Sequence, residues 1–100
     1  MERGGCVYIM TNYNKTVLYV GVTSDLLNRI QEHKIEKYPD SFTAKYQLKN
    51  CVYYEAFFTI EEAIAREKQL KNWHRKWKIE LIRKTNPELD DLAKNWFGES

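Results

Sequence analysis

The sequence has few of the features that mark secreted, membrane or disulfide-rich proteins. Its two cysteines, Cys6 and Cys51, suffice neither for a disulfide framework nor for a four-ligand zinc site. No apolar run approaches the ~20 residues that span a bilayer, and the N-terminus lacks the apolar stretch of a secretory signal. We therefore expect a cytoplasmic protein with no membrane segment and no disulfide partner. Both cysteines lie in apolar runs, which favours buried small hydrophobes over reactive thiols.

A strong net charge is also absent, and so is the composition of a disordered chain. The 100 residues carry a net charge of +2, and 43% of them are hydrophobic and 14% aromatic. A disordered tail lacks the aromatic and β-branched residues that this chain has. A chain of this length buries roughly two-thirds of its unfolded surface, enough for one core. We expect a single domain over residues 1–100.

The N-terminal quarter of the chain predicts a β-hairpin. Two runs rich in β-forming residues, 6–11 and 17–22, flank a polar, turn-prone segment that contains two asparagines. If residues 13–16 form the loop, Asn12 pairs with Val17. Side chains alternate along strands, so Tyr8 and Tyr19 then lie close together on one face of the sheet.

The remaining segments predict three longer helices, one strand and a short terminal helix. A helix begins after the N-cap candidates at 23–25 and runs to about residue 37, followed by a polar loop with Phe42 and Tyr46. A strand is expected over 52–58. Thr59 and Glu62 form a capping box for a helix over 60–73, and another helix covers 75–84. Asn86 and Pro87 begin a last short helix that ends before Gly98.

The order β-β-α-β-α-α plus a short C-terminal helix predicts an α+β domain with a small, three-stranded, mainly antiparallel sheet flanked by helices. Three features conflict with simple packing rules, and such conflicts tend to mark functional sites. Glu67 falls in the apolar stripe of the second long helix, where a carboxylate is costly unless it is paired or binds a cation. A salt bridge at the edge of the stripe is the plainer alternative to a metal ligand or general base.

The other two conflicts lie near the first helix. Arg29 and His33 are four residues apart and share the helix face that lies toward the sheet; such a pair is often surface decoration. Gly21 interrupts a strand pattern, which indicates a bulge or the close approach of another backbone or a ligand. Two tyrosines, an arginine, a histidine and a glutamate thus lie on elements that can share one sheet face, an inventory typical of a catalytic site.

These residues resemble the motifs of the GIY-YIG nuclease family. Residues 6–8 stand where the family has its first Gly-Ile-Tyr, and residues 19–21 stand for Tyr-Ile-Gly. Arg29, His33 and Glu67 match the later motif residues, and Asn86 is a further candidate at a looser spacing. The resemblance covers about residues 5–90 and is greatest to the small stand-alone bacterial branch, which is similar to the nuclease domain of the excinuclease C subunit. Cys6 and Val22 depart from the pattern, since the family has glycine at the first position and the repair enzymes carry lysine at the second.

The resemblance implies metal-dependent hydrolysis of DNA phosphodiesters, in DNA repair or processing. Glu67 would hold Mg²⁺ or Mn²⁺ with waters and phosphate oxygens, and Arg29 would grip the scissile phosphate. One of Tyr8 and Tyr19 would position or deprotonate the attacking water, with Tyr8 favoured as the base, and His33 would assist. Ordinary strand aromatics are the plainer interpretation of both tyrosines.

The near-zero net charge hides a basic segment. Residues 66–84 contain eight lysines and arginines but two glutamates, a net charge of +6 that leaves −4 for the rest of the chain. Basic residues interleaved with tryptophans suit a nucleic-acid backbone. We expect Trp73 and Trp77 to pack in the core and the following side chains to bind DNA: Lys68, Lys71, Arg75, Lys76 and Lys78. A solvated helix face is the alternative.

Two functions remain open from the sequence. The first is an endonuclease, and the second is a nucleic-acid-binding module with the nuclease fold and little activity alone. Because the chain has no second DNA-binding domain, a protein partner for targeting is a further expectation. The nuclease hypothesis requires that Tyr8, Tyr19, Arg29, His33 and Glu67 converge on one open surface.

Overall fold

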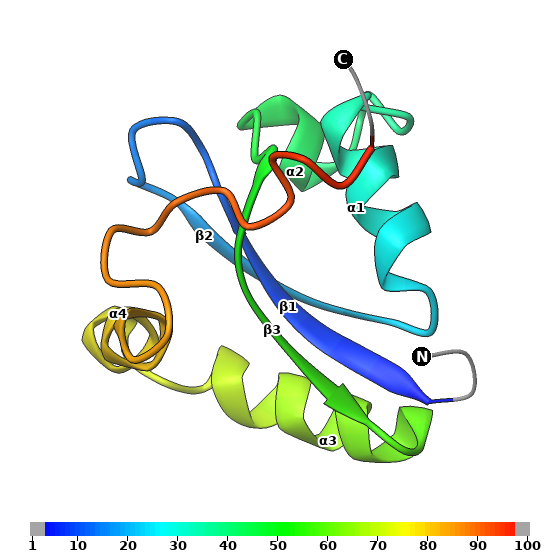
Figure 1. Ribbon diagram of the computed structural model, residues 1–100, viewed down its shortest axis with the longest axis vertical. Helices are drawn as coiled ribbons and strands as arrows, with labels where there is room; N and C mark the ends of the chain where they lie inside the picture. The colour runs from blue at the N-terminus through cyan, green and yellow to red at the C-terminus, as the bar shows by residue number, and fades with distance from the viewer. Residues whose placement is uncertain (1–3, 98–100) are drawn as a thin grey trace.

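The computed structural model describes residues 4–97 as a twisted three-stranded sheet with helices on both faces (Figure 1). Its elements follow the predicted α+β order, with one short helix added. In chain order they are β1 (Gly5–Thr11), β2 (Leu18–Thr23), α1 (Leu26–Lys34), α2 (Phe42–Lys45), β3 (Asn50–Phe57), α3 (Ile60–Lys71) and α4 (Arg75–Arg83).

The sheet has the strand order β2-β1-β3, and both pairings are antiparallel. The predicted hairpin register is confirmed, since Thr11 pairs with Leu18 and Tyr8 with Gly21. The Asn12 side chain fixes the turn: its Oδ1 accepts hydrogen bonds from the backbone N–H groups of Thr16 (2.9 Å) and Val17 (3.1 Å). This local bonding explains why a polar loop sets the register of the whole hairpin.

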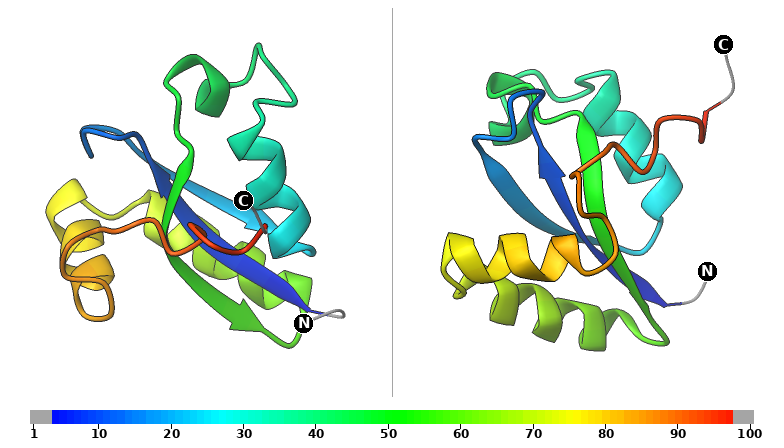
Figure 2. Two further views of the ribbon diagram at one scale, coloured as in Figure 1. Left: turned by 45° about the horizontal axis from the view of Figure 1, so that its top comes forward. Right: turned by 60° about the vertical axis from the view of Figure 1, so that its left-hand side comes forward.

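Alternation along β1 divides the core into two layers, and Figure 2 shows helices on both faces of the sheet. Val7 and Ile9 face the layer that includes Ala63 and Leu70 of α3 and Ile82 of α4. The intervening β1 side chains Tyr8 and Met10 face the other layer, with Ile30 of α1 and Leu48. Helices α1 and α3 therefore cover opposite faces of the sheet, and every residue of β1 is buried.

The helix caps follow the sequence closely, but α1 is shorter than predicted. Thr59 and Glu62 form the predicted capping box at the start of α3. Asp25 caps α1, where its side chain accepts a hydrogen bond from the backbone N–H of Asn28. The helix ends at Lys34, three residues early, because Glu36 adopts a left-handed φ of 54° that terminates the turn.

Two predictions about the irregular segments are wrong. The loop that follows α1 contains the one-turn helix α2, which Ser41 caps by accepting a hydrogen bond from the N–H of Ala44. The short C-terminal helix is not formed, and residues 92–97 run through turns instead. The tail bonds to β3: the N–H of Leu92 donates to the Cys51 carbonyl (2.7 Å), and Asp91 Oδ1 accepts from the Cys51 N–H (2.9 Å).

These bonds satisfy backbone groups of β3 that a separate terminal helix would leave unpaired. The predicted burial of Cys6 and Cys51 is confirmed. Among residues 4–97, no helix is long and apolar enough to cross a membrane.

Candidate active site

Four of the five predicted catalytic or metal-binding side chains meet on the α1 side of the sheet. The rings of Tyr8 and Tyr19 have centroids 6.3 Å apart, and the His33 ring lies 5.5 Å from Tyr8 and 6.1 Å from Tyr19. The hairpin register places both tyrosines on one face, and α1 presents Arg29 and His33 above them. The interpretation of the Arg29–His33 pair as surface decoration therefore does not hold for His33.

Gly21 makes room for this cluster. It lies opposite Tyr8 in the β1–β2 ladder, and a Cβ atom there would overlap the Tyr8 ring and hydroxyl and press on Tyr19. The group that approaches Gly21 is a side chain of the candidate site, and not the backbone or ligand that the sequence suggested.

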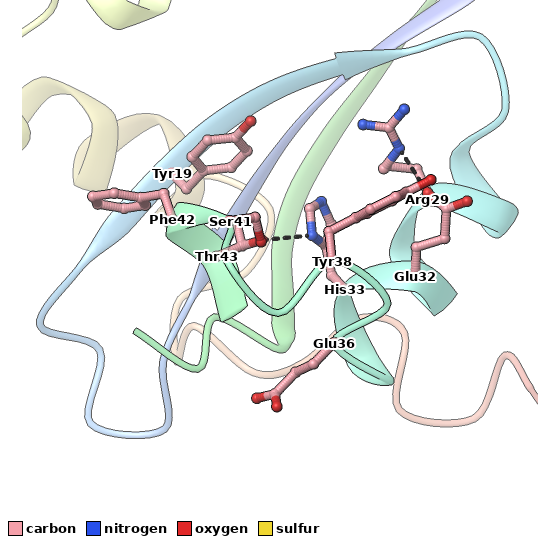
Figure 3. A pocket seen from close by; sticks show the side chains of 9 residues that line it. All are labelled: Tyr19, Arg29, Glu32, His33, Glu36, Tyr38, Ser41, Phe42 and Thr43. Carbon is pink, nitrogen blue, oxygen red and sulfur yellow. Dashed lines mark hydrogen bonds and ion pairs between the residues drawn. The ribbon is translucent and has the colours of Figure 1, made fainter. Parts of the chain in front are cut away.

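His33 connects two hydroxyl groups. Its Nε2 lies 2.8 Å from the Tyr8 hydroxyl, and its Nδ1 lies 3.0 Å from Thr43 Oγ1, which is 3.2 Å from Ser41 Oγ (Figure 3). A neutral imidazole donates from one nitrogen and accepts at the other. The ring therefore forms one link of a continuous hydrogen-bonded chain that runs from β1 to α2.

Burial controls the proton affinities in this chain. The pKa of His33 is lowered to about 4, mainly by desolvation and then by the positive charge of Arg29. His33 is therefore neutral near pH 7 and can accept a proton. The pKa of Tyr8 is raised, first by burial and then by Tyr19, while Arg29 acts in the opposite direction. In this arrangement Tyr8 stays a neutral phenol.

A cleft of about 150 Å³ opens beside the cluster. It is bounded by Tyr19 from β2, by side chains of α1 and by the segment that leads into α2 (Figure 3). The lining residues are Tyr19, Arg29, Glu32, His33, Glu36, Tyr38, Ser41, Phe42 and Thr43. Tyr8 lies behind them with 0% of its surface exposed. Of the two tyrosines Tyr8 and Tyr19, only Tyr19 therefore reaches the open cleft.

Arg29 supplies the positive charge at this cleft. Its Nε lies 3.2 Å from Glu32 Oε1, and the side chain remains 43% exposed. A guanidinium anchored through Nε keeps its terminal nitrogens available for a phosphate. The arrangement suits the binding of a phosphodiester close to two phenols and a neutral imidazole.

Glu67 does not share the sheet face of the tyrosines, which corrects the simple expectation of one common face. It lies on α3, across the sheet from α1, with its side chain 14% exposed and its Oε2 2.7 Å from Lys71 Nζ. The pKa of Lys71 is raised mainly by Glu67 and in smaller part by Tyr19. Glu67 and Tyr19 thus both act on Lys71. Tyr19 belongs to β2, an outer strand that α3 also contacts, so the two faces of the sheet meet near this edge.

The donor set supplies one carboxylate to a metal ion, so waters or phosphate oxygens must supply the other ligands. Within residues 4–97 no three His, Cys, Asp or Glu side chains form a metal-binding group. Mg²⁺ is often held by one or two carboxylates together with waters and phosphate oxygens. Glu67 fits this pattern as a single carboxylate, and Lys71 is the cation that now neutralises it.

Comparison with known proteins agrees with this geometry. The family model described as the GIY-YIG catalytic domain matches residues 4–80. The chain belongs to the GIY-YIG family. It is also 37% identical over 82 residues to a UPF0213 protein of Syntrophus aciditrophicus (strain SB), a match that covers 82% of this chain and 92% of the relative.

A solved structure has the same fold. The solution NMR structure of a UPF0213 protein from Bacillus halodurans matches with a TM-score of 0.55 and 24% sequence identity, over 95% of this chain and 98% of the other. The likeness in fold to this structure covers nearly the whole chain, and the motif tyrosines lie on adjacent strands of the sheet.

The basic segment of this GIY-YIG chain lies mainly on α3 and α4. Four of the five predicted nucleic-acid-binding side chains are exposed, namely Lys68, Lys71, Arg75 and Lys76, whereas Lys78 is half-buried. Arg75 donates a hydrogen bond to the Lys15 carbonyl (2.8 Å) and so ties α4 to the hairpin turn. Trp73 packs against the core as predicted, but Trp77 is 50% exposed and lies edge-on to Trp73.

Asn86, the looser candidate, makes its contacts with backbone. It is buried, and its Nδ2 donates to the carbonyls of Val52 (3.1 Å) and Asp90 (2.8 Å), while its Oδ1 accepts from the Asp90 N–H (3.0 Å). These bonds fasten the C-terminal tail to β3 and indicate a structural role.

Sequence reasoning missed the contribution of the segment before β3. Thr43 of this segment bonds to His33, and Tyr38 and Phe42 line the cleft. Glu32 of α1, which also lines the cleft, was missed as well. One signal was available, because Ser41 has the residue type and position of an N-cap. A four-residue helix is too short for the periodicity that reveals longer ones.

Proposed function

We propose that this protein is a divalent-metal-dependent endonuclease that hydrolyses DNA phosphodiesters and acts in cytoplasmic DNA repair or processing. The observation that carries the proposal is the grouping of Tyr19, Arg29 and His33 around one open cleft, with Tyr8 directly behind. Membership of the GIY-YIG family supports the same reaction class.

Arg29 binds the scissile phosphate in this proposal. Its exposed guanidinium presents paired donors to phosphate oxygens and stabilises the negative charge that grows in the transition state. The neighbouring Glu32 holds Nε and so limits the orientations of the side chain.

Tyr19 is the tyrosine that contacts the attacking water. The sequence favoured Tyr8 as the base, but its complete burial supports the reverse assignment, with Tyr8 as the partner. A phenol is a weak base near pH 7 unless cations stabilise the phenolate. Lys71 interacts with Tyr19, and Arg29 lines the same cleft, so two cations lie near this tyrosine. His33, neutral near pH 7, forms the hydrogen bond that orients the Tyr8 hydroxyl.

Glu67 would hold one Mg²⁺ or Mn²⁺, with water and phosphate oxygens as the other ligands. When bound, such an ion supplies Lewis-acid stabilisation of the leaving oxygen. For this role Glu67 must exchange the Lys71 ammonium for the metal. The exposed basic residues of α3 and α4 would then track the DNA backbone on either side.

The proposal is tested by incubating the purified protein with single-stranded, branched, damaged and duplex DNAs, with and without Mg²⁺ or Mn²⁺. We expect metal-dependent cutting that falls by at least about 100-fold in Arg29→Ala and in Glu67→Ala. Tyr19→Phe should lose more activity than Tyr8→Phe. Glu61→Ala, which changes an exposed glutamate of the same helix, is the matched control and should cut normally. Robust cutting by both Arg29→Ala and Glu67→Ala would contradict the residue assignments.

The second candidate function is a nucleic-acid-binding module with little activity alone. It is favoured by the ion pair that occupies Glu67 and by the lack of a three-residue metal group in the described part of the chain. This alternative predicts DNA binding that weakens with salt, by about 0.9 units of log Kd per log unit of salt for each phosphate contacted. Binding without cutting on every substrate would favour it and would be consistent with a separate targeting partner.

A further inference from the structure

Two aromatic rings at one wall of the cleft continue onto a third ring just outside it. Tyr19 and Phe42 are stacked, with centroids 6.2 Å apart and planes inclined by 27°, and Phe42 lies 4.7 Å from Tyr46. Phe42 is 49% exposed and Tyr46 is 51% exposed. We name Tyr19, Phe42 and Tyr46 the aromatic shelf. Figure 3 shows the Tyr19 and Phe42 rings side by side at one end of the cleft.

The fold does not need the outer rings of the shelf to hold α2 in place. This helix is anchored by buried Thr43, which bonds to His33, and by the Ser41 cap. Leu48, fully buried after the helix, fixes the return of the chain to the sheet. Phe42 and Tyr46 therefore leave aromatic surface in water beside a candidate active site. A clustered patch of this kind marks a binding surface more often than scattered exposed hydrophobics do.

We propose that the aromatic shelf stacks one unpaired nucleobase of the DNA, next to the phosphate held by Arg29. The inference rests on the proposed nuclease function and names the substrate class: DNA in which the nucleotide beside the cut phosphate is not base-paired. Aromatic side chains bind bases through their π-faces without regard to sequence. A paired base inside a duplex has both faces covered by its neighbours, so it reaches such a shelf only after leaving the stack.

The size of the cleft agrees with a single flat group. Its volume of about 150 Å³ is below the ~300 Å³ or more of pockets that enclose drug-sized ligands. Tyr38, 56% exposed, also lines the cleft and lies on the Arg29 side in Figure 3. Aromatic surface thus borders the cleft at both ends.

The two carboxylates in the cleft do not oppose a nucleotide. Glu32 lies 3.2 Å from Arg29 and 3.4 Å from Lys37, and Glu36 lies 3.5 Å from Lys49. Each negative charge is therefore matched by a neighbouring cation. The carboxylate oxygens also suit the exocyclic amino groups of bases, which need acceptors.

The test compares Phe42→Ala with the wild-type protein on three DNAs of one sequence. These are a single strand, the fully paired duplex, and single strands in which an abasic nucleotide is placed at successive positions around the mapped cut. We expect the wild type to cut the single strand faster than the duplex and to lose rate when the abasic nucleotide adjoins the cut. Phe42→Ala should lose about 5- to 100-fold in kcat/KM on the intact strand.

The loss of rate caused by the abasic nucleotide and the loss caused by Phe42→Ala should not add, because each removes one partner of the same stack. Phe42→Leu keeps most of the apolar volume but removes the aromatic ring. Its melting temperature shows whether it is folded, and a folded Phe42→Leu protein should still cut the intact strand more slowly than the wild type. Phe58→Ala is the matched control, since Phe58 is 94% exposed and does not line the cleft. This control should cut like the wild type.

Equal cutting of the intact and abasic strands by the wild type, together with unchanged rates for Phe42→Ala, would contradict the proposal that the aromatic shelf stacks a base. The proposed nuclease function would then still stand. A second measurement tests the aromatic shelf even if the protein cuts no substrate. A single strand that contains 2-aminopurine is titrated with protein in EDTA, where no cutting occurs. Quenching by wild type that is lost in Phe42→Ala supports the shelf even if no substrate is cut. Equal quenching by both proteins counts against it.

Discussion

Gly21 lies directly beneath Tyr8, so the smallest residue of β2 supports the most buried phenol of the candidate site. The two residues are partners in the β1–β2 ladder, and a Cβ at Gly21 would overlap the Tyr8 ring and hydroxyl. The Tyr8 hydroxyl can therefore take the position from which it bonds to His33 at 2.8 Å. The second glycine of the family pattern is thus required by packing between two motif residues.

Gly21→Ala should displace Tyr8 and break its bond to His33. Overpacking of this kind costs about 1–3 kcal/mol of the free energy of unfolding, which denaturant titration measures. Cutting of DNA should fall together with stability. Tyr8→Phe is the informative comparison, since it keeps the ring over Gly21 and removes only the hydroxyl. If Gly21→Ala is as stable and active as the wild type, the close contact does not constrain the site.

His33 should make stability depend on pH in the acid range. Its pKa is about 4 in the folded protein against 6.5 for an ordinary histidine. Between these values the unfolded chain binds a proton that the folded protein does not, so the free energy of unfolding rises with pH. The slope from this group is at most about 1.4 kcal/mol per pH unit, and its contribution is constant above pH 6.5.

The measurement is denaturant unfolding of wild type and His33→Gln at several pH values between 4 and 7. The variant should lose this part of the slope, whereas His74→Gln, which changes an exposed histidine, should retain it. Carboxylates contribute to the slope of every form of the protein, so the difference in slope between the two variants is the quantity that matters. Identical slopes for His33→Gln and His74→Gln would contradict a strongly lowered pKa.

The sequence predicted those parts of the molecule that depend on local rules. The hairpin register followed from the Asn12 turn, and the start of α3 followed from the Thr59–Glu62 capping box. The grouping of Tyr8, Tyr19 and His33 then followed from strand alternation and helix spacing. Long-range contacts escaped prediction. Asn86 holds the tail through a bond to β3, which is distant in the sequence. The residues of the tail therefore gave no local sign that the last helix would be absent.

Burial of individual side chains was equally hard to foresee. Sequence spacing treats Tyr8 and Tyr19 alike, yet Tyr8 lies on the central strand and is fully buried, while Tyr19 lies on the outer strand beside the cleft. The same limit applies to Glu67, whose position in the α3 stripe was identified but whose side of the sheet was not. Strand order decides the first and the face on which α3 packs decides the second, and both are properties of the assembled sheet.

Replacing Lys71 should ease metal binding at Glu67. The Lys71 ammonium lies 2.7 Å from the Glu67 carboxylate and competes with any divalent cation for it. Because the lysine side chain is 52% exposed, the ion pair is weak, and its loss should improve metal affinity by about 2- to 5-fold. Titration of Lys71→Met with Mn²⁺ by calorimetry, without DNA, measures this directly. Lys68→Met, on the same helix and exposed, should leave the Mn²⁺ affinity unchanged. A weaker Mn²⁺ affinity in Lys71→Met would contradict the competition.

Asn86→Ala should destabilise the fold without acting on the chemistry. Asn86 makes two donor bonds and one acceptor bond to backbone groups of β3 and the tail, and its loss leaves the buried Val52 carbonyl without this partner. We expect a loss of about 2–4 kcal/mol in the free energy of unfolding. Asn95→Ala, in an exposed position of the same tail, is the control and should be near neutral. At a temperature where Asn86→Ala is fully folded, its kcat on DNA should equal that of the wild type. A loss of kcat in the folded variant would instead return Asn86 to the active site, because a residue that only fastens the tail has no means of altering the rate of the chemical step.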